Sequence, residues 1–305
     1  MNSPRRLGRN DAEYPPDLLH LEEPPNPLWV IGRDLAALPP CVALVGARKA
    51  TPYGIDVAKM LAADLASAGA CVVSGMAMGI DAAAHEGALS VLGGSTLAVL
   101  GTGIDVAYPP SSRPLYKRIA ETGTLLSQFP PRTRGYKVNF RIRNWTIAAL
   151  SLAVVVVQGK HPMSGALITA DAAVKIGRPV FAVPGDIRAE VSSGPNELLK
   201  DGARPCTCAA DVLGELGAEL RRSVALADFS LPPGLNETER AVMSALFAEP
   251  ARPEAVAALA GIDPLDTVRT LSRLEIGGLV GRAPGGTFRA LPRRLERPDE
   301  GAGPA

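Results

Sequence analysis

The chain has 305 residues, of which 47% are hydrophobic, and its 32 basic and 31 acidic side chains leave a formal net charge of +1. This length and apolar content indicate a globular protein of about two domains. The longest apolar run, residues 147–157, is shorter than the roughly 20 residues of a membrane helix, and the small net charge argues against a broad duplex-binding face.

The amino-terminal residues, 1–13, are polar. We expect them to form a tail, and because they contain no apolar signal core we expect the chain to stay in the cytoplasm. Short runs rich in valine and leucine then alternate with helical segments. The predicted strands are residues 41–45, 70–73, 96–100, 124–127, 153–157 and 180–183.

These runs lack polar alternation, which is typical of strands buried on both faces of a parallel sheet. Intervening segments such as residues 55–68 and 82–92 have the composition of covering helices. Residues 14–217 are therefore predicted to form an extended Rossmann-like α/β domain, with a doubly wound, mostly parallel sheet.

A linker is predicted at residues 218–234, where a mixed-charge segment ends in Leu-Pro-Pro-Gly. Residues 235–291 then show the order helix, helix, helix, hairpin, which indicates a small C-terminal winged-helix domain. Asn236 with Glu239 predicts a capping box, and Asp263 followed by proline predicts the start of the third helix. Residues 292–305 are polar and rich in Pro and Gly, which predicts a disordered tail.

The charge of the predicted winged-helix domain argues against duplex reading. Residues 235–291 contain six arginines against seven Asp or Glu residues. A domain with a net charge near −1 is poorly suited to contacting phosphates. We therefore predict an accessory or protein-contact module.

Three predicted strand ends carry glycines just before a helix begins. They are Gly46-Ala-Arg48-Lys49, the segment 74–81 with Gly75, and Gly101-Thr-Gly103. Exposed amides at such positions attract phosphate, and Arg48 with Lys49 would add charge, although tight turns alone would also explain the glycines. None matches a dinucleotide fingerprint or a nucleotide P-loop, so NAD binding and ATP hydrolysis are poorly supported.

Positive charge is concentrated in residues 122–170, which contain Arg and Lys but no Asp or Glu. Phe140 lies within this run, between Lys137 and Arg143. Cations beside an aromatic ring suit single-stranded nucleic acid, because phosphates need neutralising and bases need a stacking face. We predict that Phe140 faces a ligand and that Trp145 is buried, although scarce rings are often core anchors.

Catalytic patterns have little support, so we predict a protein that is not an enzyme. No serine or cysteine has a nucleophile-elbow context. His85 follows Asp81 by four residues on one predicted helix, which favours a structural pair over an acid/base couple. Cys206-Thr-Cys208 lacks the spacing of a zinc site.

In their order along the chain, several short motifs resemble the DNA-processing protein A family (DprA, also called Smf). They include Val45-Gly-Ala-Arg48, Ser74-Gly-Met-Ala-Met-Gly-Ile-Asp81, Gly101-Thr-Gly103, Phe140 with Arg143-Asn144, Ser164-Gly-Ala-Leu-Ile-Thr169 and residues 177–185. Each motif is weak alone, but their order is specific and covers most of the chain.

The resemblance implies an extended Rossmann fold that binds single-stranded DNA in a pocket, forms a homodimer, and loads RecA recombinase onto DNA during processes such as DNA uptake and transformation. It implies no catalysis and no cofactor. By motif position the implied DNA-binding residues are Gly46, Arg48, Gly75, Lys137, Phe140, Arg143, Asn144, Ser164 and Gly165, and the charge argument above adds Lys49. Arg141, Trp145 and Met163 depart from the usual family residues.

Two other functions remain open on the sequence alone. One is an enzyme of the related lysine-decarboxylase-like group, which cleaves nucleoside monophosphates; its Pro-Gly-Gly-x-Gly-Thr loop is missing here, since Pro184-Gly185 continues as Asp-Ile-Arg. The other is a nucleotide-binding sensor, in which the pocket holds a small nucleotide and the C-terminal domain transmits the signal.

Overall fold

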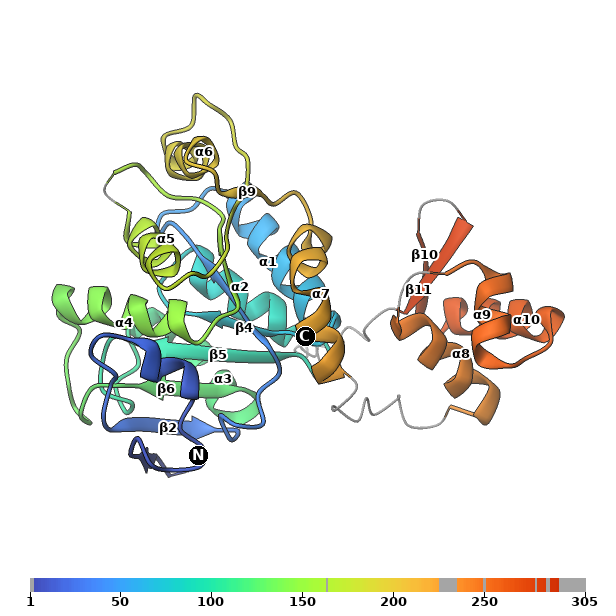
Figure 1. Ribbon diagram of the computed structural model, residues 1–305, viewed down its shortest axis with the longest axis horizontal. Coiled ribbons are helices and arrows are strands. Elements are labelled where there is room, and N and C mark those ends of the chain that lie inside the picture. The colour runs from blue at the N-terminus through green and yellow to red at the C-terminus, as the bar shows by residue number, and fades with distance from the viewer. Residues whose placement is uncertain are drawn as a thin grey trace, which may run out of the picture. The chain divides into compact units, whose positions relative to one another are not determined.

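The computed structural model of the protein describes residues 3–162, 164–224, 235–248, 251–277, 279–283 and 286–290. The chain divides into two compact units, Met1–Ala227 and Asp228–Ala305, each of which is described by itself (Figure 1). Among the described helices, none is long and apolar enough to cross a membrane.

The first unit is built on a nine-stranded sheet with the order β1-β2-β6-β5-β4-β3-β7-β8-β9. Strands β3 to β9 run parallel to their neighbours, and β1 and β2 add an antiparallel edge. The strands are β1 (Arg5–Leu7), β2 (Leu28–Gly32), β3 (Cys41–Val45), β4 (Cys71–Ser74), β5 (Ser95–Leu100), β6 (Thr124–Ser127), β7 (Ala153–Val156), β8 (Val180–Ala182) and β9 (Arg204–Pro205).

The strand order reverses between β3 and β7. From β3 the chain proceeds outward through β4, β5 and β6, and then returns to place β7 on the other side of β3, with Val42 opposite Ala153. In open α/β sheets, ligands bind in the crevice outside the carboxyl ends of the strands at such a reversal. The topology therefore directs attention to the loops that follow Val45 and Val156.

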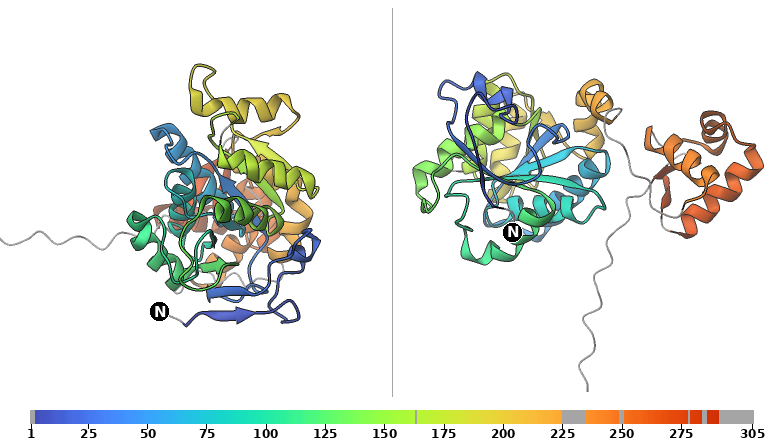
Figure 2. Two further views of the ribbon diagram at one scale, coloured as in Figure 1. Left: turned by 90° about the vertical axis from the view of Figure 1, so that its left-hand side faces the viewer. Right: turned by 90° about the horizontal axis from the view of Figure 1, so that it is seen from below.

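Helices cover both faces of this sheet (Figures 1 and 2). On one face, α1, α2 and α7 bury small and aliphatic side chains against β3, β4 and β7, and on the other, α4 and α5 do the same. The helices of the unit are α1 (Pro52–Ser67), α2 (Ile80–Leu89), α3 (Arg113–Thr122), α4 (Lys137–Ala149), α5 (Gly165–Lys175), α6 (Ser193–Lys200) and α7 (Ala209–Val224), with short 3-10 turns η1 (Pro16–His20), η2 (Pro110–Ser112) and η3 (Glu190–Ser192).

All six predicted strands are present, each within one residue of the expected ends, because their Val-rich and Leu-rich sequences are buried on both faces of the sheet. The fold class is confirmed as a Rossmann-like, mostly parallel sheet with a second small domain. Three short strands were missed. Two of them, β1 and β9, have only three and two residues, too few to leave a periodic pattern.

Two predicted boundaries need correction. Residues 1–13 are not simply a tail, since β1 pairs with β2 and the Arg5 guanidinium donates to the Gly32 carbonyl at 3.0 Å. The segment expected to begin the linker at residue 218 is helical up to Val224, within α7. The predictions for residues 225–234 and 291–305 lie outside the described residues.

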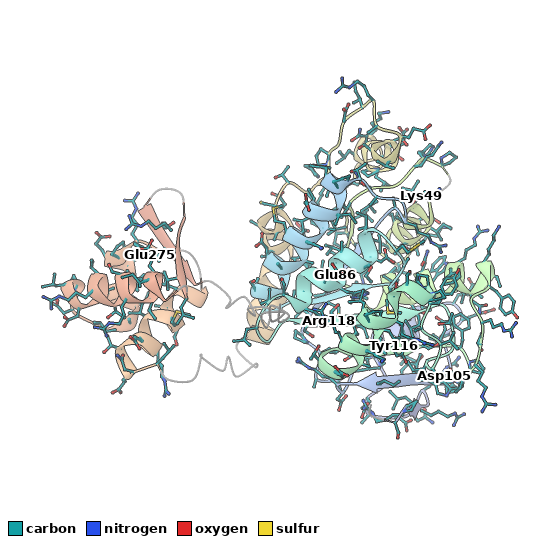
Figure 3. The ribbon with its side chains drawn as sticks, turned by 180° about the vertical axis from the view of Figure 1, so that it is seen from behind. Lys49, Glu86, Asp105, Tyr116, Arg118 and Glu275 are labelled. Carbon is teal, nitrogen blue, oxygen red and sulfur yellow. The ribbon has the colours of Figure 1, made fainter. Side chains whose placement is uncertain are left out.

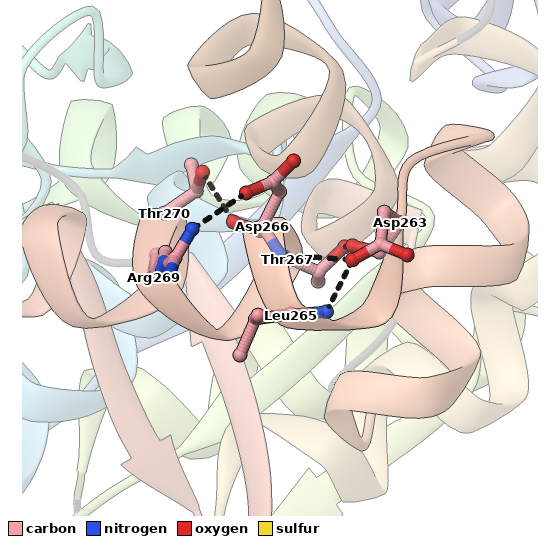
Figure 4. Close-up of polar contacts among 6 residues, drawn as sticks. All are labelled: Asp263, Leu265, Asp266, Thr267, Arg269 and Thr270. Carbon is pink, nitrogen blue, oxygen red and sulfur yellow. Dashed lines mark hydrogen bonds and ion pairs between the residues drawn. The ribbon is translucent and has the colours of Figure 1, made fainter.

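The second unit consists of α8 (Glu237–Ala248), α9 (Pro253–Ala260), α10 (Pro264–Ile276) and the hairpin strands β10 (Val280–Ala283) and β11 (Thr287–Ala290). The predicted capping box is present: the Asn236 amide donates to the Glu239 carboxylate at 3.0 Å, and the Glu239 amide donates to the Asn236 side chain at 2.8 Å. Asp263 caps α10 by accepting from the Leu265 amide at 2.9 Å (Figure 4). The winged-helix order is therefore confirmed.

Candidate nucleic-acid interface

A cavity of about 830 Å³ opens at the strand reversal, between the loop after β3, the amino-terminal half of α4 and the start of α5. Three arginines and three lysines line it, against the carboxylates of Asp81 and Glu190. The six cations are Arg48, Lys49, Lys137, Arg141, Arg143 and Lys160. Figure 3 labels Lys49, which follows β3, on the same side of the unit as Asp105, which follows β5.

The half-buried ring of Phe140 lies at the wall of this cavity. The Arg48 guanidinium carbon lies 5.2 Å from the ring centroid and that of Arg143 lies 5.9 Å from it. The Tyr108 ring is tilted against it at a centroid distance of 5.3 Å. Two cations and a second ring therefore lie within about 6 Å of the Phe140 ring centroid, and cations beside aromatic rings suit the binding of a base with its phosphate.

Arg143 is the buried member of this group, with 4% of its surface exposed. Its Nη1 donates to the carbonyls of Gly75 at 2.6 Å and Val99 at 2.5 Å, and its Nε donates to the Asn144 side chain at 3.1 Å. Burial lowers the pKa of Arg143 to about 10, Asp81 opposes this shift, and Arg48 adds to it. Most of the N–H groups of Arg143 therefore donate to other residues of the chain, so Arg143 holds the cavity wall in position.

Asp81 occupies the place that the sequence assigned to a bound phosphate. Its carboxylate accepts from the amides of Gly75 at 3.2 Å and Ala77 at 3.4 Å, and also bonds the amide of Gly46. Burial raises the pKa of Asp81, while Arg143 and the three amides oppose the shift. The amides of Gly75 and Ala77 are therefore not free to bind an anion, because an internal carboxylate already uses them.

The third glycine loop serves packing. A β-carbon at Gly101 would lie 2.3 Å from the Phe140 ring atom Cδ1, and the Gly103 amide donates to the Thr133 carbonyl at 2.9 Å. These glycines let the loop after β5 support the Phe140 ring. The sequence left two interpretations of these glycines, phosphate binding and a tight turn, and the structure supports the tight turn.

The amino terminus of α5 forms the opposite wall. The Ser164 hydroxyl caps this helix by accepting from the Ala166 amide at 3.3 Å, and Gly165 is exposed at the first helical position. Asn144 connects the two walls, since its amide nitrogen donates to the Gly165 carbonyl at 3.0 Å. The partial positive charge of a helix amino terminus adds to the field of the cavity.

The loop that carries Arg48 is fixed on both sides. Gln158, which follows β7, accepts from the Thr51 amide at 3.0 Å and donates to its hydroxyl at 2.8 Å. Gly79 has a φ of 80°, and a β-carbon there would lie 2.3 Å from the Ala47 carbonyl oxygen. This close approach requires glycine, and it holds the loops after β3 and β4 together.

Of the ten residues predicted for the site, nine line this single cavity: Gly46, Arg48, Lys49, Lys137, Phe140, Arg143, Asn144, Ser164 and Gly165. Gly75 does not, since it is buried and both its backbone groups are bonded within the chain. Sequence reasoning did not assign Tyr108, Arg141, Lys160 or Glu190 to the site. The sequence does distinguish the first three: Arg141 and Lys160 lie in the basic run, and Tyr108 is an aromatic residue in a chain with few of them.

His85 is fully buried, and its pairing with Asp81 was predicted wrongly. Its Nδ1 lies 2.7 Å from the Thr96 hydroxyl, which itself donates to the Val72 carbonyl, so the imidazole is the donor to Thr96. Burial, helped by Arg143, lowers the pKa of His85 to about 3. It is therefore a neutral structural residue.

Trp145 is half-buried against the core beneath α4, with the Lys175 amine 5.8 Å from its ring centroid. The prediction that Trp145 is buried is met in part, since the ring packs against the core but stays partly exposed. Met163 lies outside the described residues.

Comparison with known proteins identifies the family. Residues 5–217 match the family model described as DNA recombination-mediator protein A, and residues 229–286 match the DprA winged helix domain. This chain belongs to the DNA recombination-mediator protein A family. It is 33% identical over 317 residues to protein Smf of Synechocystis sp., covering 93% of this chain and 79% of that protein.

Other relatives and solved structures of the family agree. The putative DNA processing protein DprA of Mycobacterium tuberculosis is 40% identical over 264 residues, covering 84% of this chain and 66% of that protein. The X-ray structure of DprA from Streptococcus pneumoniae aligns with a TM-score of 0.66 at 37% identity, over 69% of this chain and 74% of that one.

A structure of DNA processing protein A from Helicobacter pylori, described as showing a unique single-stranded DNA binding mode, aligns with a TM-score of 0.64 at 30% identity. The alignment covers 71% of this chain and 96% of that one.

Proposed function

We propose that this protein binds single-stranded DNA in the cavity at the β3/β7 reversal. The arrangement of Arg48 over the Phe140 ring, together with three further cations of the cavity that form no ion pair within the described part of the chain, carries the proposal. Arg48, Lys49, Lys137 and Arg141 form no ion pair with any of the described residues. The binding mode reported for the Helicobacter pylori relative supports the same ligand.

A nucleotide sensor is less well supported. In doubly wound folds a nucleotide phosphate takes the amides at the start of a helix that follows a strand. Here the Asp81 carboxylate takes the amides of Gly75 and Ala77 just before α2. The free cations instead belong to side chains around an aromatic ring, which suits a polynucleotide.

We further propose that the bound strand is delivered to a RecA recombinase, that the protein acts as a homodimer in the cytoplasm, and that it works in DNA recombination and uptake without catalysis. Membership of the recombination-mediator family supports the first part. The position of His85 supports the last, because this imidazole is fully buried and bonded to Thr96, and burial lowers its pKa to about 3.

The second unit is proposed to contact protein. Three of its arginines already pair with carboxylates: Arg269 with Asp266, Arg273 with Glu239, and Arg282 with Glu275. Arginines neutralised in this way contribute little attraction for a DNA backbone.

The experiment is a fluorescence titration with oligothymidine and with a duplex of equal length, each at two salt concentrations. We expect tighter binding of the single strand, weakening with salt, and a loss of roughly tenfold or more with Phe140→Ala or Arg48→Ala. Equal affinity for both DNA forms, or wild-type affinity in both variants, would contradict the proposal. Thermal unfolding of each variant checks that the fold is intact.

A further inference from the structure

Tyr136 is an exposed ring beside the cavity that the proposed function does not use. Its neighbours Gly135 and Lys137 line the cavity, whereas Tyr136 itself lies outside it with 59% of its surface exposed. The ring forms no hydrogen bond or aromatic contact with the described residues. In contrast, Tyr14 and Tyr116 are buried and donate their hydroxyls to backbone carbonyls.

The backbone of Tyr136 is fixed relative to Phe140. As the residue before α4, Tyr136 accepts through its carbonyl from the amides of Asn139 at 3.0 Å and Phe140 at 3.4 Å. A β-carbon at the preceding Gly135 would lie 3.0 Å from the tip of the Phe140 ring. Both rings are therefore presented by one rigid turn.

The loop before Tyr136 is also anchored, and it carries positive charge. The Arg132 amide donates to the Asp105 carboxylate at 2.7 Å, and the Thr133 carbonyl accepts from the Gly103 amide at 2.9 Å. The side chains of Arg132 and Arg134 are exposed and form no ion pair with the described residues. Asp105 is the carboxylate that contacts this loop.

We propose that Tyr136 is a second base-stacking platform, which receives a nucleobase of a single strand after the strand leaves the cavity. The inference rests on the proposed single-strand binding and extends the site along Arg132 and Arg134. Four residues of a helix rise about 6 Å, and stacked nucleotides of one strand rise about 3.4 Å each along the helix axis of DNA. A strand stacked on Phe140 thus reaches Tyr136 about two nucleotides later.

Charge favours DNA over a protein as the occupant of this surface. Val138 and Ile142 are also exposed on α4, and alone they would fit an apolar partner. However, residues 122–170 contain no Asp or Glu, and Tyr136 stands between two residues of the cavity wall. The surface continues the proposed DNA site in both charge and position.

The test measures affinity for a series of oligothymidines, from lengths that fill only the cavity to lengths that extend past it. For the long oligomers we expect Tyr136→Ala to weaken binding about tenfold, or about 1.4 kcal/mol. For the shortest that bind, we expect less than a twofold change. Tyr136→Phe keeps the ring and should bind like the wild type, and Val138→Ala is the matched control, an equally exposed side chain without a π-face.

A uniform loss at all lengths, wild-type affinity at all lengths, or an equal loss with Tyr136→Phe would overturn the proposal. So would a change in oligomeric state with Tyr136→Ala that leaves DNA binding intact, because it would assign this surface to a protein contact. These results are distinct from failure of the cavity itself, which would show as wild-type affinity in Phe140→Ala.

Discussion

The cavity of the first unit and the α10–β10 region of the second unit differ in how their arginines are paired. In the first unit, Arg48 and Arg141 line a cavity without a carboxylate partner. In the second, Arg269, Arg273 and Arg282 each pair with a carboxylate of the same unit. Winged helices often bind DNA, and Rossmann-like sheets often bind nucleotides. In this protein the arrangement of charge instead favours DNA binding by the Rossmann-like unit and a protein contact by the winged helix.

The units also differ in what they bury. The first places a guanidinium, a carboxylate and an imidazole in its interior: Arg143, Asp81 and His85. The core of the second is made of residues such as Val242, Leu246 and Leu271. Charges in the first unit are thus linked to its stability, whereas those of the second lie mainly at its surface.

The largest expected effect concerns the buried arginine. Arg143→Ala leaves the Gly75 and Val99 carbonyls without their donor and removes the charge that offsets Asp81. We expect it to destabilise the first unit by about 3–5 kcal/mol, whereas Arg269→Ala removes the exposed pair with Asp266 in the second unit and costs about 0–1 kcal/mol. Urea unfolding measures the loss of unfolding free energy in both variants. Similar losses would show that charged side chains matter equally for the stability of the two units.

The next effect is on DNA affinity. Arg48→Ala removes an unpaired cation beside the Phe140 ring, and we expect single-strand affinity to fall roughly tenfold with a shallower salt dependence. Arg269→Ala, on α10 of the second unit, should change single-strand affinity less than twofold. A larger loss from Arg269→Ala would make the second unit a DNA-binding domain after all.

Acid should destabilise the first unit more than the second. Burial lowers the pKa of His85 from 6.5 to about 3, so between these values the unfolded chain binds a proton that the native state excludes. Stability is therefore full above pH 6.5 and falls as the pH drops, by about 1–2 kcal/mol from pH 6.5 to 5. The Asp228–Ala305 unit contains no histidine.

Urea unfolding at both pH values, with His85→Gln as the variant that should lose this dependence, checks the expectation. An acid response unchanged by the substitution would show that another group is responsible.

The smallest effect is expected at Glu190, whose carboxylate lines the cavity and pairs with Lys160 at 2.9 Å. Both side chains are more than half exposed, so the pair adds little stability. Glu190→Gln should free Lys160 for phosphate and raise single-strand affinity about threefold. In a Lys160→Gln background the gain should shrink, and an undiminished gain would show that Glu190 acts by repulsion alone.

Much of the fold was predictable because its causes are local. The run Cys41–Val45 is apolar along its length. The start of α10 is also local, because Asp263 caps the helix by accepting from the Leu265 amide and Pro264 is its first residue. Strand β2 was missed because its pairing depends on β6, almost a hundred residues away. Short edge strands are stabilised by such neighbours, which a sequence window does not include.

The candidate site was predictable in its members but not in the role of each. The basic run around Phe140 predicted which residues line the cavity, because charge and the ability to stack follow directly from residue type. Whether an arginine points inward is decided by packing: Arg143 turns toward the Gly75 carbonyl, while Arg141, two residues earlier, is exposed. The same limit applies to the Gly75 loop, where only the fold shows that Asp81 accepts from the Gly75 amide.

The carboxylate of Asp81 has a consequence for the protein in a living cell. Backbone amides left open at the start of a helix attract the phosphates of free nucleotides. Because the Asp81 carboxylate accepts from the amides of Gly75 and Ala77, these two amides are closed to a nucleotide phosphate. The cationic side chains of the cavity are then the groups that a phosphate would contact.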